Sequence, residues 1–369
     1  MKFSIERDQL LRPLQLINSV VERRQTLPIL GNILLTTVDD KLHLTGTDLE
    51  VELSGIAPLK TLTTPGSVTV PARKLLDICR LLPEDSILEF THDAHRLVLA
   101  VNKSRFSLST LPAAEFPKVN ESPDGVKFSL DTAHLKQIIE RTQFAMAQQD
   151  VRYYLNGTYW QIESGRMATV ATDGHRLALC KTPLTAASQE LATKVIIPRK
   201  AIMELSKILA NNEQATNIVV SQNHIRFSIG DLVLVSKLIE GRFPDYQAII
   251  PRNCQQHLRI DRDLFKTILT RVSILSNEKY RGVRLAAHDN QLRVSASNPE
   301  HEEASEELNV DFQGEQIEIG LNVNYLLDVL NTLPKGLIHL SFSGADKSVV
   351  LEHEQDILEA LNIIMPMRL

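Results

Sequence analysis

The sequence lacks most of the features that mark secreted, membrane-bound or metal-binding proteins. Its 369 residues include only 3 cysteines, widely spaced, so neither a disulfide framework nor a paired-cysteine metal site is indicated. No apolar run approaches the roughly 18 residues that cross a bilayer, and Met1 leads into the polar stretch KFSIERDQ, where an export signal would be apolar. We therefore expect a cytoplasmic protein without a membrane partner.

Catalytic and cofactor motifs are equally scarce. The chain contains no P-loop, no GxGxxG, no HExxH and no GxSxG nucleophile elbow. For an enzyme, the remaining candidate is the stretch ATDGHRL, where Asp173 and His175 would form a general acid–base pair. Related turns occur at TGTDLE and SASNPE, so Asp173 is more simply a turn residue that binds its own backbone. We predict no catalytic residue, no metal and no cofactor.

What the sequence does contain is one pattern that occurs three times. The chain opens with MKFSIERDQLLRPLQL, and related starts follow at residue 126 (VKFSLDTAHLKQII) and residue 257 (HLRIDRDLFKTIL). Each third divides again into a strand, a helix with apolar residues at 3.6-residue spacing, and alternating strands. We predict an α+β protein of three tandem domains, 1–125, 126–256 and 257–369, each built from two β-α-β-β-β units with antiparallel sheets.

Charge is distributed unevenly between the predicted helices and the rest of the chain. The helices together carry a net charge of +5 in a chain of −5; they lie near residues 7–20, 72–82, 131–146, 198–210, 261–272 and 322–332. A cationic helical surface in an acidic protein favours a bound polyanion, although Lys and Arg are also good helix formers. Only 5% of the residues are aromatic and the helices carry no aromatic stripe, which argues against stacking on single strands.

Helix spacing limits how such a surface would enclose duplex DNA. Six helices packed side by side about 8–10 Å apart would form a ring with a hole of roughly 15–19 Å, too narrow for a duplex roughly 20 Å across. Twelve helices would give about 30–38 Å between axes. A ring with helices lining a central hole and sheets outside would therefore be a dimer. The basic cluster Lys74, Arg96, Lys103 and Arg105 and the acidic run NPEHEEASEE favour a head-to-tail contact between opposite ends.

The whole chain resembles the bacterial sliding clamps, the beta subunits of DNA polymerase III. The stretches that carry the resemblance are LPILGN, TGTDLE, VPARK, RFSLSTLPAAEFP, QDVRYYLNG, ATDGHRLA, SNEKYRGVRL and the C-terminal MPMRL. The resemblance implies a head-to-tail homodimeric ring that encircles duplex DNA, slides along it and tethers polymerase to the template.

The resemblance also implies a partner-peptide pocket between the second and third repeats. Apolar residues would form its floor, and Arg152, His175 and Arg176 would supply polar anchors. The matching positions are Arg152, Tyr154, Leu155, Thr172, Gly174, His175, Arg176, Leu177, Pro244, Ile249, Tyr325, Ser348, Ile363, Met365, Pro366, Met367 and Arg368. The sequence departs from the enterobacterial pattern at Gln247 and Ala248, where two arginines are familiar, and Ile249, Ile363 and Ile364 replace smaller valines.

Two further residue sets follow from the resemblance. The implied DNA contacts are Arg24, Arg73, Gln149, Tyr153, Tyr154, Arg199 and Lys200. The implied dimer contact sets Lys74, Arg105, Phe106 and Leu108 against Ile274, Leu275, Glu300, Glu302 and Glu303.

The implied partners are macromolecules. They are duplex DNA bound without sequence specificity, a second copy of the chain, the polymerase alpha subunit, the clamp-loader complex, and other polymerases and repair proteins with clamp-binding peptides. The alternatives to a topological clamp are an enzyme, a static scaffold, and a nucleic-acid binder that does not encircle its ligand. Retention on nicked circular DNA that is lost on linearisation would distinguish a clamp from a static scaffold and from a binder that does not encircle.

Overall fold

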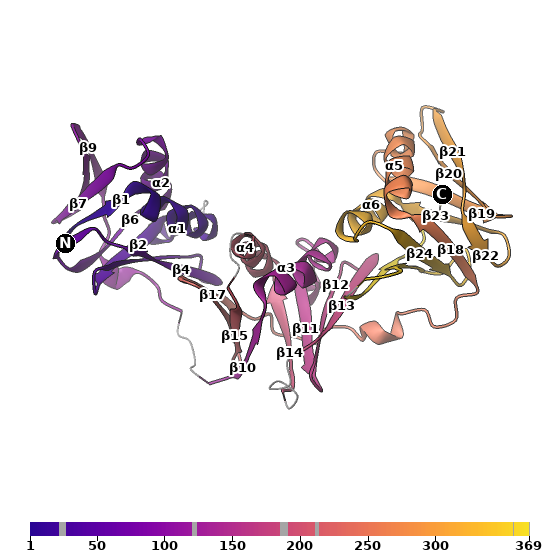
Figure 1. Ribbon diagram of the computed structural model, residues 1–369, viewed down its shortest axis with the longest axis horizontal. Helices are drawn as coiled ribbons and strands as arrows, with labels where there is room; N and C mark the ends of the chain where they lie inside the picture. Colours follow the sequence, from indigo (N-terminus) through magenta and orange to yellow (C-terminus); the bar gives the residue numbers. More distant parts are fainter. Residues whose placement is uncertain (22–26, 120–123, 185–190, 211–213, 357, 369) are drawn as a thin grey trace. The chain divides into compact units, whose positions relative to one another are not determined.

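The computed structural model describes residues 1–21, 27–119, 124–184, 191–210, 214–356 and 358–368. In these residues a strand, a helix and three strands follow one another six times, as the repeat pattern predicts (Figure 1). The helices are α1 (Arg7–Val20), α2 (Ala72–Leu81), α3 (Thr132–Glu140), α4 (Arg199–Leu209), α5 (Arg262–Val272) and α6 (Val323–Thr332). None of the helices in the described ranges is both long and apolar enough to cross a membrane.

The chain forms two compact units that do not follow the sequence repeats. Unit 1 is Met1–Lys136 with Lys200–Leu238, and unit 2 is Gln137–Arg199 with Ile239–Leu369. The middle repeat is divided because its strands belong to two different sheets, each of which continues into a neighbouring repeat. The three-domain division by sequence therefore stays a prediction.

Unit 1 contains two antiparallel sheets. The five-stranded sheet has the order β5 (Thr61–Thr64), β1 (Lys2–Glu6), β7 (Ile87–Asp93), β8 (Arg96–Val101), β9 (Ser104–Ser109). The eight-stranded sheet has the order β10 (Val126–Leu130), β15 (Thr216–Val220), β16 (His224–Ile229), β17 (Leu232–Lys237), β4 (Val51–Pro58), β3 (Lys41–Thr47), β2 (Asn32–Val38), β6 (Gly66–Pro71). Helix α1 packs against α2 and strands β3 and β4 through Leu10, Leu14 and Ile17, which the 3.6-residue period places on one face.

Unit 2 also contains two antiparallel sheets. The nine-stranded sheet has the order β14 (Thr193–Pro198), β11 (Gly157–Glu163), β12 (Arg166–Thr172), β13 (Arg176–Pro183), β26 (Glu359–Ile364), β25 (Val349–His353), β24 (Leu337–Phe342), β18 (Gln256–Asp261), β22 (Asp311–Gln313). The four-stranded sheet has the order β21 (Glu303–Asn309), β20 (Gln291–Ser297), β19 (Gly282–His288), β23 (Ile317–Asn322). Helices α5 and α6 lie side by side (Figure 1) and pack against one core with both sheets.

One helix end differs from the sequence-based prediction, and 3-10 turns follow two of the helices. The helix expected over 131–146 ends at Glu140, where Thr142 turns its hydroxyl back to the carbonyl of Ile138, and a 3-10 turn follows at Gln143–Ala145. Helix α5 ends at Val272 and is followed by a 3-10 turn, Ser273–Leu275. Tight 3-10 turns are common at helix ends, and apolar periodicity does not distinguish them from a further α-helical turn.

Candidate functional site

All the residues expected in the peptide pocket lie in unit 2, around the junction of strands β13 and β26. These strands pair with Leu177 opposite Ile363, and they join the second repeat to the third. Beyond β26 the C-terminal segment is bound to the turn between β12 and β13, because the amide of Met365 donates to the carbonyl of His175 at 2.9 Å. Met367 donates to the carbonyl of Gly320 at 2.9 Å. The C-terminal segment is therefore held by backbone hydrogen bonds on both sides.

The floor of this junction is apolar. Leu155, Leu177 and Ile363 are 2%, 3% and 1% exposed, and they belong to one cluster of buried side chains. Tyr154 and Ile249 are partly buried against the same cluster. The cluster also contains Phe243 and Tyr246, which the resemblance did not supply; the aromatic residues around Pro244 in GRFPDY were the available signal.

The turn between β12 and β13 is held by its own side chains. Oδ1 of Asp173 accepts from the amides of His175 at 2.9 Å and Arg176 at 3.0 Å, so the expected turn role of Asp173 is confirmed. Gly174 has a φ of +89°, and a Cβ there would lie 2.9 Å from Nη2 of Arg152. Glycine is therefore favoured at this position for its backbone conformation, because any other residue would be strained at this φ and the Arg152 side chain would have to shift.

Arg176 is an internal cation rather than an open rim residue. Its Nε donates to Oδ2 of Asp173 at 3.1 Å, its Nη1 to Oδ2 of Asp328 at 2.5 Å, and its Nη2 to the carbonyl of Phe144 at 2.7 Å. The guanidinium carbon lies 4.4 Å from the ring centroid of Tyr325. The side chain of Arg176 is only 11% exposed, so its main role is to position the turn and little of it is accessible to a ligand.

Arg152 and the C-terminal residues also contact the turn between β12 and β13, Arg152 through the carbonyl of Asp173 at 3.2 Å and Met365 through that of His175. Arg152 donates to Asp150, and these hydrogen bonds lower the pKa of Asp150 to about 2, so the pair is ionised at neutral pH. The hydroxyl of Ser348 lies 3.0 Å from Sδ of Met365. The remaining expected positions at the junction are half-buried or exposed: Pro244, Tyr325, Pro366 and Met367 are half-buried, and His175, Gln247, Ala248 and Arg368 are exposed.

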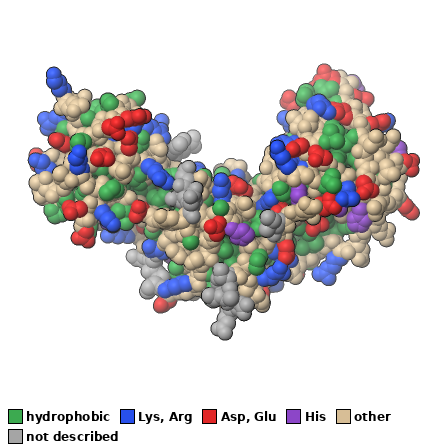
Figure 2. All heavy atoms as spheres, viewed as in Figure 1, with side chains coloured by type: hydrophobic (Ala, Val, Ile, Leu, Met, Phe, Trp, Pro, Cys, Tyr) green, Lys and Arg blue, Asp and Glu red, His purple; other side chains and the backbone are tan. Residues whose placement is uncertain are grey.

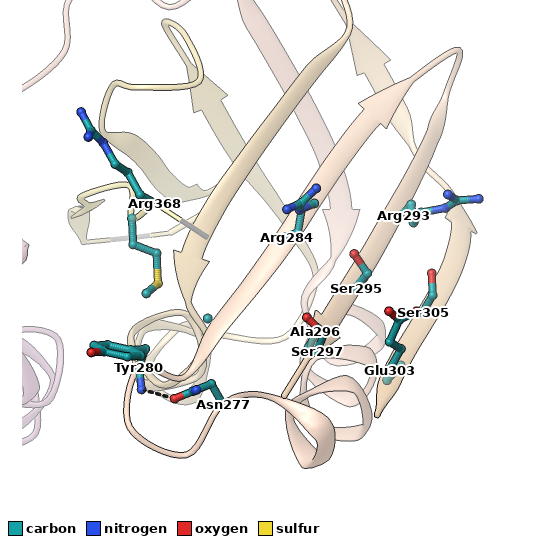
Figure 3. Close-up of a pocket in the computed structure, with 13 residues that line it drawn as sticks. Asn277, Tyr280, Arg284, Arg293, Ser295, Ala296, Ser297, Glu303, Ser305 and Arg368 are labelled. Atoms are coloured by element: carbon teal, nitrogen blue, oxygen red, sulfur yellow. Dashed lines mark hydrogen bonds between the residues drawn. The ribbon is translucent and has the colours of Figure 1, made fainter. Parts of the chain in front are cut away.

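A pocket lies beside this junction, on the polar face of the four-stranded sheet. It has a volume of about 670 Å³ and shares only Met367 and Arg368 with the expected set. Figure 3 shows serines and arginines from neighbouring strands on its floor and Tyr280 and Arg368 at its edge. Ser295 and Ser305 have small side chains, which leave space for the pocket. Arg284 forms an ion pair with Glu318 at 2.7 Å. Alternation predicted these strand faces, but sequence alone did not predict the pocket.

The expected DNA-contact residues differ in how much they are already bound. Arg24 lies outside the described residues. The side chain of Arg73 on α2 is 83% exposed, with Asp77 at 3.8 Å. Lys200 instead donates to the carboxylate of Asp48, a side chain only 6% exposed, and to the carbonyl of Val20 at 3.2 Å.

The other expected DNA contacts lie in unit 2. Nη1 of Arg199 donates to the carbonyl of Met146 at 3.1 Å, and Tyr154 is partly buried. Gln149 is exposed in the left-handed region with a φ of +55°, and Tyr153 is 57% exposed. Gln149 and Tyr153 are thus available to a ligand, whereas Arg199 is partly engaged.

Part of the expected dimer set lies at the open edges of two sheets, with Arg105, Phe106 and Leu108 on β9 and Glu303 on β21. Lys74 lies on α2, and Ile274 and Leu275 lie in the 3-10 turn after α5. Strand β9 ends the five-stranded sheet and β21 ends the four-stranded sheet, and within the described ranges neither edge has a further partner. Ile274 is 74% exposed, and Leu275 and Phe106 are half-buried. Leu108 is only 6% exposed and is therefore buried within the single chain. The charged members Lys74, Arg105, Glu300, Glu302 and Glu303 are all exposed. Figure 2 shows Lys and Arg side chains at the β9 end of unit 1.

The candidate catalytic residues are not arranged for acid–base or nucleophilic catalysis. Both oxygens of Asp173 are occupied by the turn and by Arg176, so a catalytic pair with His175 lacks a carboxylate. Burial raises the pKa of Cys79 and of Cys180 to about 12, which leaves both thiols protonated and poor nucleophiles. In the part of the chain that the structure describes, no group of three His, Cys, Asp or Glu side chains is arranged to hold a metal.

Three family models match successive parts of the chain. They describe the N-terminal, central and C-terminal domains of the DNA polymerase III beta subunit and cover residues 1–120, 129–245 and 247–368. The chain is 47% identical over 369 residues to the Beta sliding clamp of Pseudomonas aeruginosa, and 46% identical over 370 residues to that of Escherichia coli K12. In both comparisons all of each chain is covered.

Solved structures agree with these matches. A crystal structure of the DNA polymerase III subunit beta from Pseudomonas aeruginosa has a TM-score of 0.95 at 46% identity, with all of both chains covered. A second structure from that organism, bound to griselimycin, has a TM-score of 0.96 at 46% identity, again with all of both chains covered. The pol III beta of Caulobacter crescentus has a TM-score of 0.93 at 38% identity over the same full coverage.

Proposed function

We propose how this chain functions from one premise: it belongs to the bacterial sliding clamps, the beta subunits of DNA polymerase III. It is a processivity clamp for DNA replication, a non-catalytic subunit that serves DNA polymerase and does not itself polymerise DNA. A dimeric ring and a pocket for partner proteins are typical of this family. DNA, polymerase and a second copy of the chain are the partners that membership implies.

The first part of the proposal is a head-to-tail dimer that closes into a ring around duplex DNA. Its support is the pair of open edges, β9 with the basic Arg105 and β21 with the acidic Glu303. Edge strands with opposite charge pair with each other more readily than either pairs with itself. Ile274 supplies an exposed apolar side chain next to the acidic edge, where burial in a dimer would be favourable.

The second part is that the β13–β26 junction binds short hydrophobic peptides of partner proteins. The observation that carries it is the attachment of the C-terminal segment to the turn at His175 over a buried apolar floor. Polar backbone groups beside an apolar floor are what a peptide site needs, because they orient the chain while the floor binds its side chains. A relative bound to griselimycin supports a ligand site in the family.

The third part concerns DNA and the finer list of partners. Arg73, Gln149 and Tyr153 are exposed and suit non-specific phosphate contact, joined by Arg24; Lys200 and Arg199 act mainly within the chain. The polymerase alpha subunit, the clamp-loader complex and repair proteins with clamp-binding peptides would share the β13–β26 junction. Replication takes place in the bacterial cytoplasm, so we assign the chain to that compartment.

Removal of residues 365–369 tests the peptide site. The segment lies past the last strand, so its deletion should leave the dimer and its thermal unfolding nearly unchanged. Peptide affinity should fall at least tenfold, since the segment bound to the turn at His175 is lost from the junction. Fluorescence anisotropy with a labelled polymerase-tail peptide measures the affinity, and sedimentation measures the dimer. Arg166→Ala, which changes an exposed residue of β12 outside the expected pocket set, is the control and should leave peptide affinity unchanged. Unchanged peptide affinity after the deletion would remove this junction from the proposal.

A further inference from the structure

Unit 1 contains a turn that matches the turn of the proposed peptide site bond for bond. In one turn Oγ1 of Thr47 donates to the carbonyl four residues later at 2.9 Å and accepts from the amide two residues later at 3.1 Å; Thr172 does the same at 2.6 and 3.1 Å. Oδ1 of Asp48 accepts from the amides two and three residues later, as Oδ1 of Asp173 does. The two turns are therefore local copies of each other.

The strands beyond the turns are also equivalent. Strand β17 pairs with β4 in unit 1, as β26 pairs with β13 in unit 2. Past the end of the pairing, the amide of Lys237 donates to the carbonyl of Glu50 at 2.9 Å, the counterpart of the bond from Met365 to His175 at 2.9 Å. The same backbone frame is thus present twice in one chain.

One residue of the copied turn differs in a way that requires an explanation. Leu49 occupies the position of Gly174, and its φ is +78° against +89° for the glycine. A leucine in the left-handed region is strained by its Cβ, and the side chain is 38% exposed, so burial does not hold it there. Strain of this kind persists where the surrounding structure enforces it, and it is concentrated at functional sites.

The strained leucine lines a pocket of about 350 Å³. Leu49, Pro117 and Val119 give it apolar walls, and Thr47 lies at its base; Lys118, Lys237 and His224 complete the lining. In the described residues neither lysine has an acidic side chain within 4.0 Å. The volume is at the lower end of the range for small-ligand sites, which suits one or two side chains.

The nearby acids do not cancel this positive charge completely. The carboxylate of Asp48 is paired with Lys200, and Oε2 of Glu52 accepts from the amide of Val119 at 3.1 Å. Glu50 is exposed on the turn. Two lysines that form no ion pair within the described residues, beside an apolar wall, therefore leave a cationic rim with an apolar centre. Such a rim complements a carboxylate next to an aliphatic side chain.

We propose that this pocket is a second peptide site, specific for a linear segment in which a leucine-like side chain is flanked by carboxylates. The inference rests on the proposed function, because the copied frame in unit 2 is taken there as a peptide site. The two sites differ in selectivity: the strained Leu49 and the lysines Lys118 and Lys237 favour acidic segments in unit 1. A clamp with both sites would hold two segments of a partner, or one segment from each of two partners.

The test uses the full chain and a fluorescein-labelled pentapeptide, Glu-Asp-Leu-Asp-Gly, with anisotropy followed to millimolar protein. We expect binding that weakens as salt rises, and that weakens about tenfold in the double variant Lys118→Glu with Lys237→Glu. Leu49→Gly should weaken it similarly while the thermal midpoint stays equal to or above that of the parent chain, because glycine relieves the strain. The parent chain should bind a peptide with alanine in place of leucine less tightly than the leucine peptide. The Leu49→Gly variant should bind both peptides with the same low affinity.

The result distinguishes this inference from the proposed function. Deletion of residues 365–369 should leave binding of the acidic pentapeptide unchanged, although it removes binding of the hydrophobic polymerase-tail peptide. The inference is overturned if the pentapeptide does not bind, if its binding is lost only with that deletion, or if Leu49→Gly and the lysine variants bind it normally. Competition by inorganic phosphate or by a short DNA duplex, equal for the leucine and alanine peptides, would indicate a simple anion site and would overturn it too.

Discussion

At the scale of single residues, the polar groups of the β13–β26 junction work mainly by fixing backbone segments in place. Arg176 ties its own turn to α6 through Asp328 and to the 3-10 turn through the carbonyl of Phe144. All three kinds of guanidinium nitrogen have an acceptor, and the side chain is 11% exposed. Such a buried cation is difficult to replace, because its removal leaves carboxylates without a partner in a partly desolvated place.

We therefore expect Arg176→Gln to destabilise unit 2 by about 2–4 kcal/mol, since it leaves Asp173 and Asp328 without a cation. The matched control is Arg166→Gln. Its ion pair with Glu359 is solvent-exposed, with side chains 57% and 56% exposed, and should contribute under ~1 kcal/mol. Urea unfolding measures both shifts in midpoint. Equal, small shifts would mean that Arg176 is a rim residue after all.

Residue-level prediction from the sequence succeeded where partners are local. The turn role of Asp173 follows from a Thr-Asp motif, because the amides that donate to its carboxylate are two and three residues away. The role of Arg176 does not follow, since Phe144, Tyr325 and Asp328 are remote in sequence and only the fold brings them together. Lys200 is a similar case: nothing in the sequence pairs it with Asp48.

At the scale of elements, apolar periodicity found the six helices but not the partners of the strands. The alternation of apolar and polar residues predicts which face of a strand is buried, but it does not predict which strand pairs with it. Strands β4 and β17, like β13 and β26, pair across repeats and merge neighbouring repeats into one sheet. The six copies of the strand-helix-strand unit are therefore confirmed, while the compact units divide the middle repeat and the three-domain bounds stay a prediction.

The open sheet edges give the prediction that belongs to this scale. Burial of Ile274 and Leu275 in a dimer should be worth about 1.5–3 kcal/mol each, against under ~1 for an exposed ion pair. The double variant Ile274→Ala with Leu275→Ala should therefore give folded monomers at concentrations where Glu302→Ala remains largely dimeric. Leu337→Ala, an exposed leucine on β24 outside the expected contact, is the control for lost apolar surface. Sedimentation of an intact dimer for the double variant would show that the contact lies elsewhere.

At the scale of the whole molecule, a chain with a net charge of −5 has to stay on DNA, which is itself acidic. Figure 2 shows both signs of charge interspersed over the visible faces of the units, without a single large basic patch. Electrostatic attraction alone would then hold DNA weakly and with strong salt dependence. The proposed closed ring would remove that difficulty, because retention would depend on topology and the contacts would only have to permit sliding.

Retention should accordingly depend on the form of the DNA more than on any one contact. Arg73→Ala removes an exposed cation, so it should flatten the salt dependence of direct binding by about one unit of slope. Lys200→Ala should leave that slope unchanged and instead lower stability, because the buried Asp48 loses its partner. Both variants, once loaded on nicked circular DNA by the clamp loader, should stay on the circle through gel filtration and leave within minutes of linearisation. Loss of Arg73→Ala from intact circles at moderate salt would mean that phosphate contacts, and not encirclement, hold the protein on DNA.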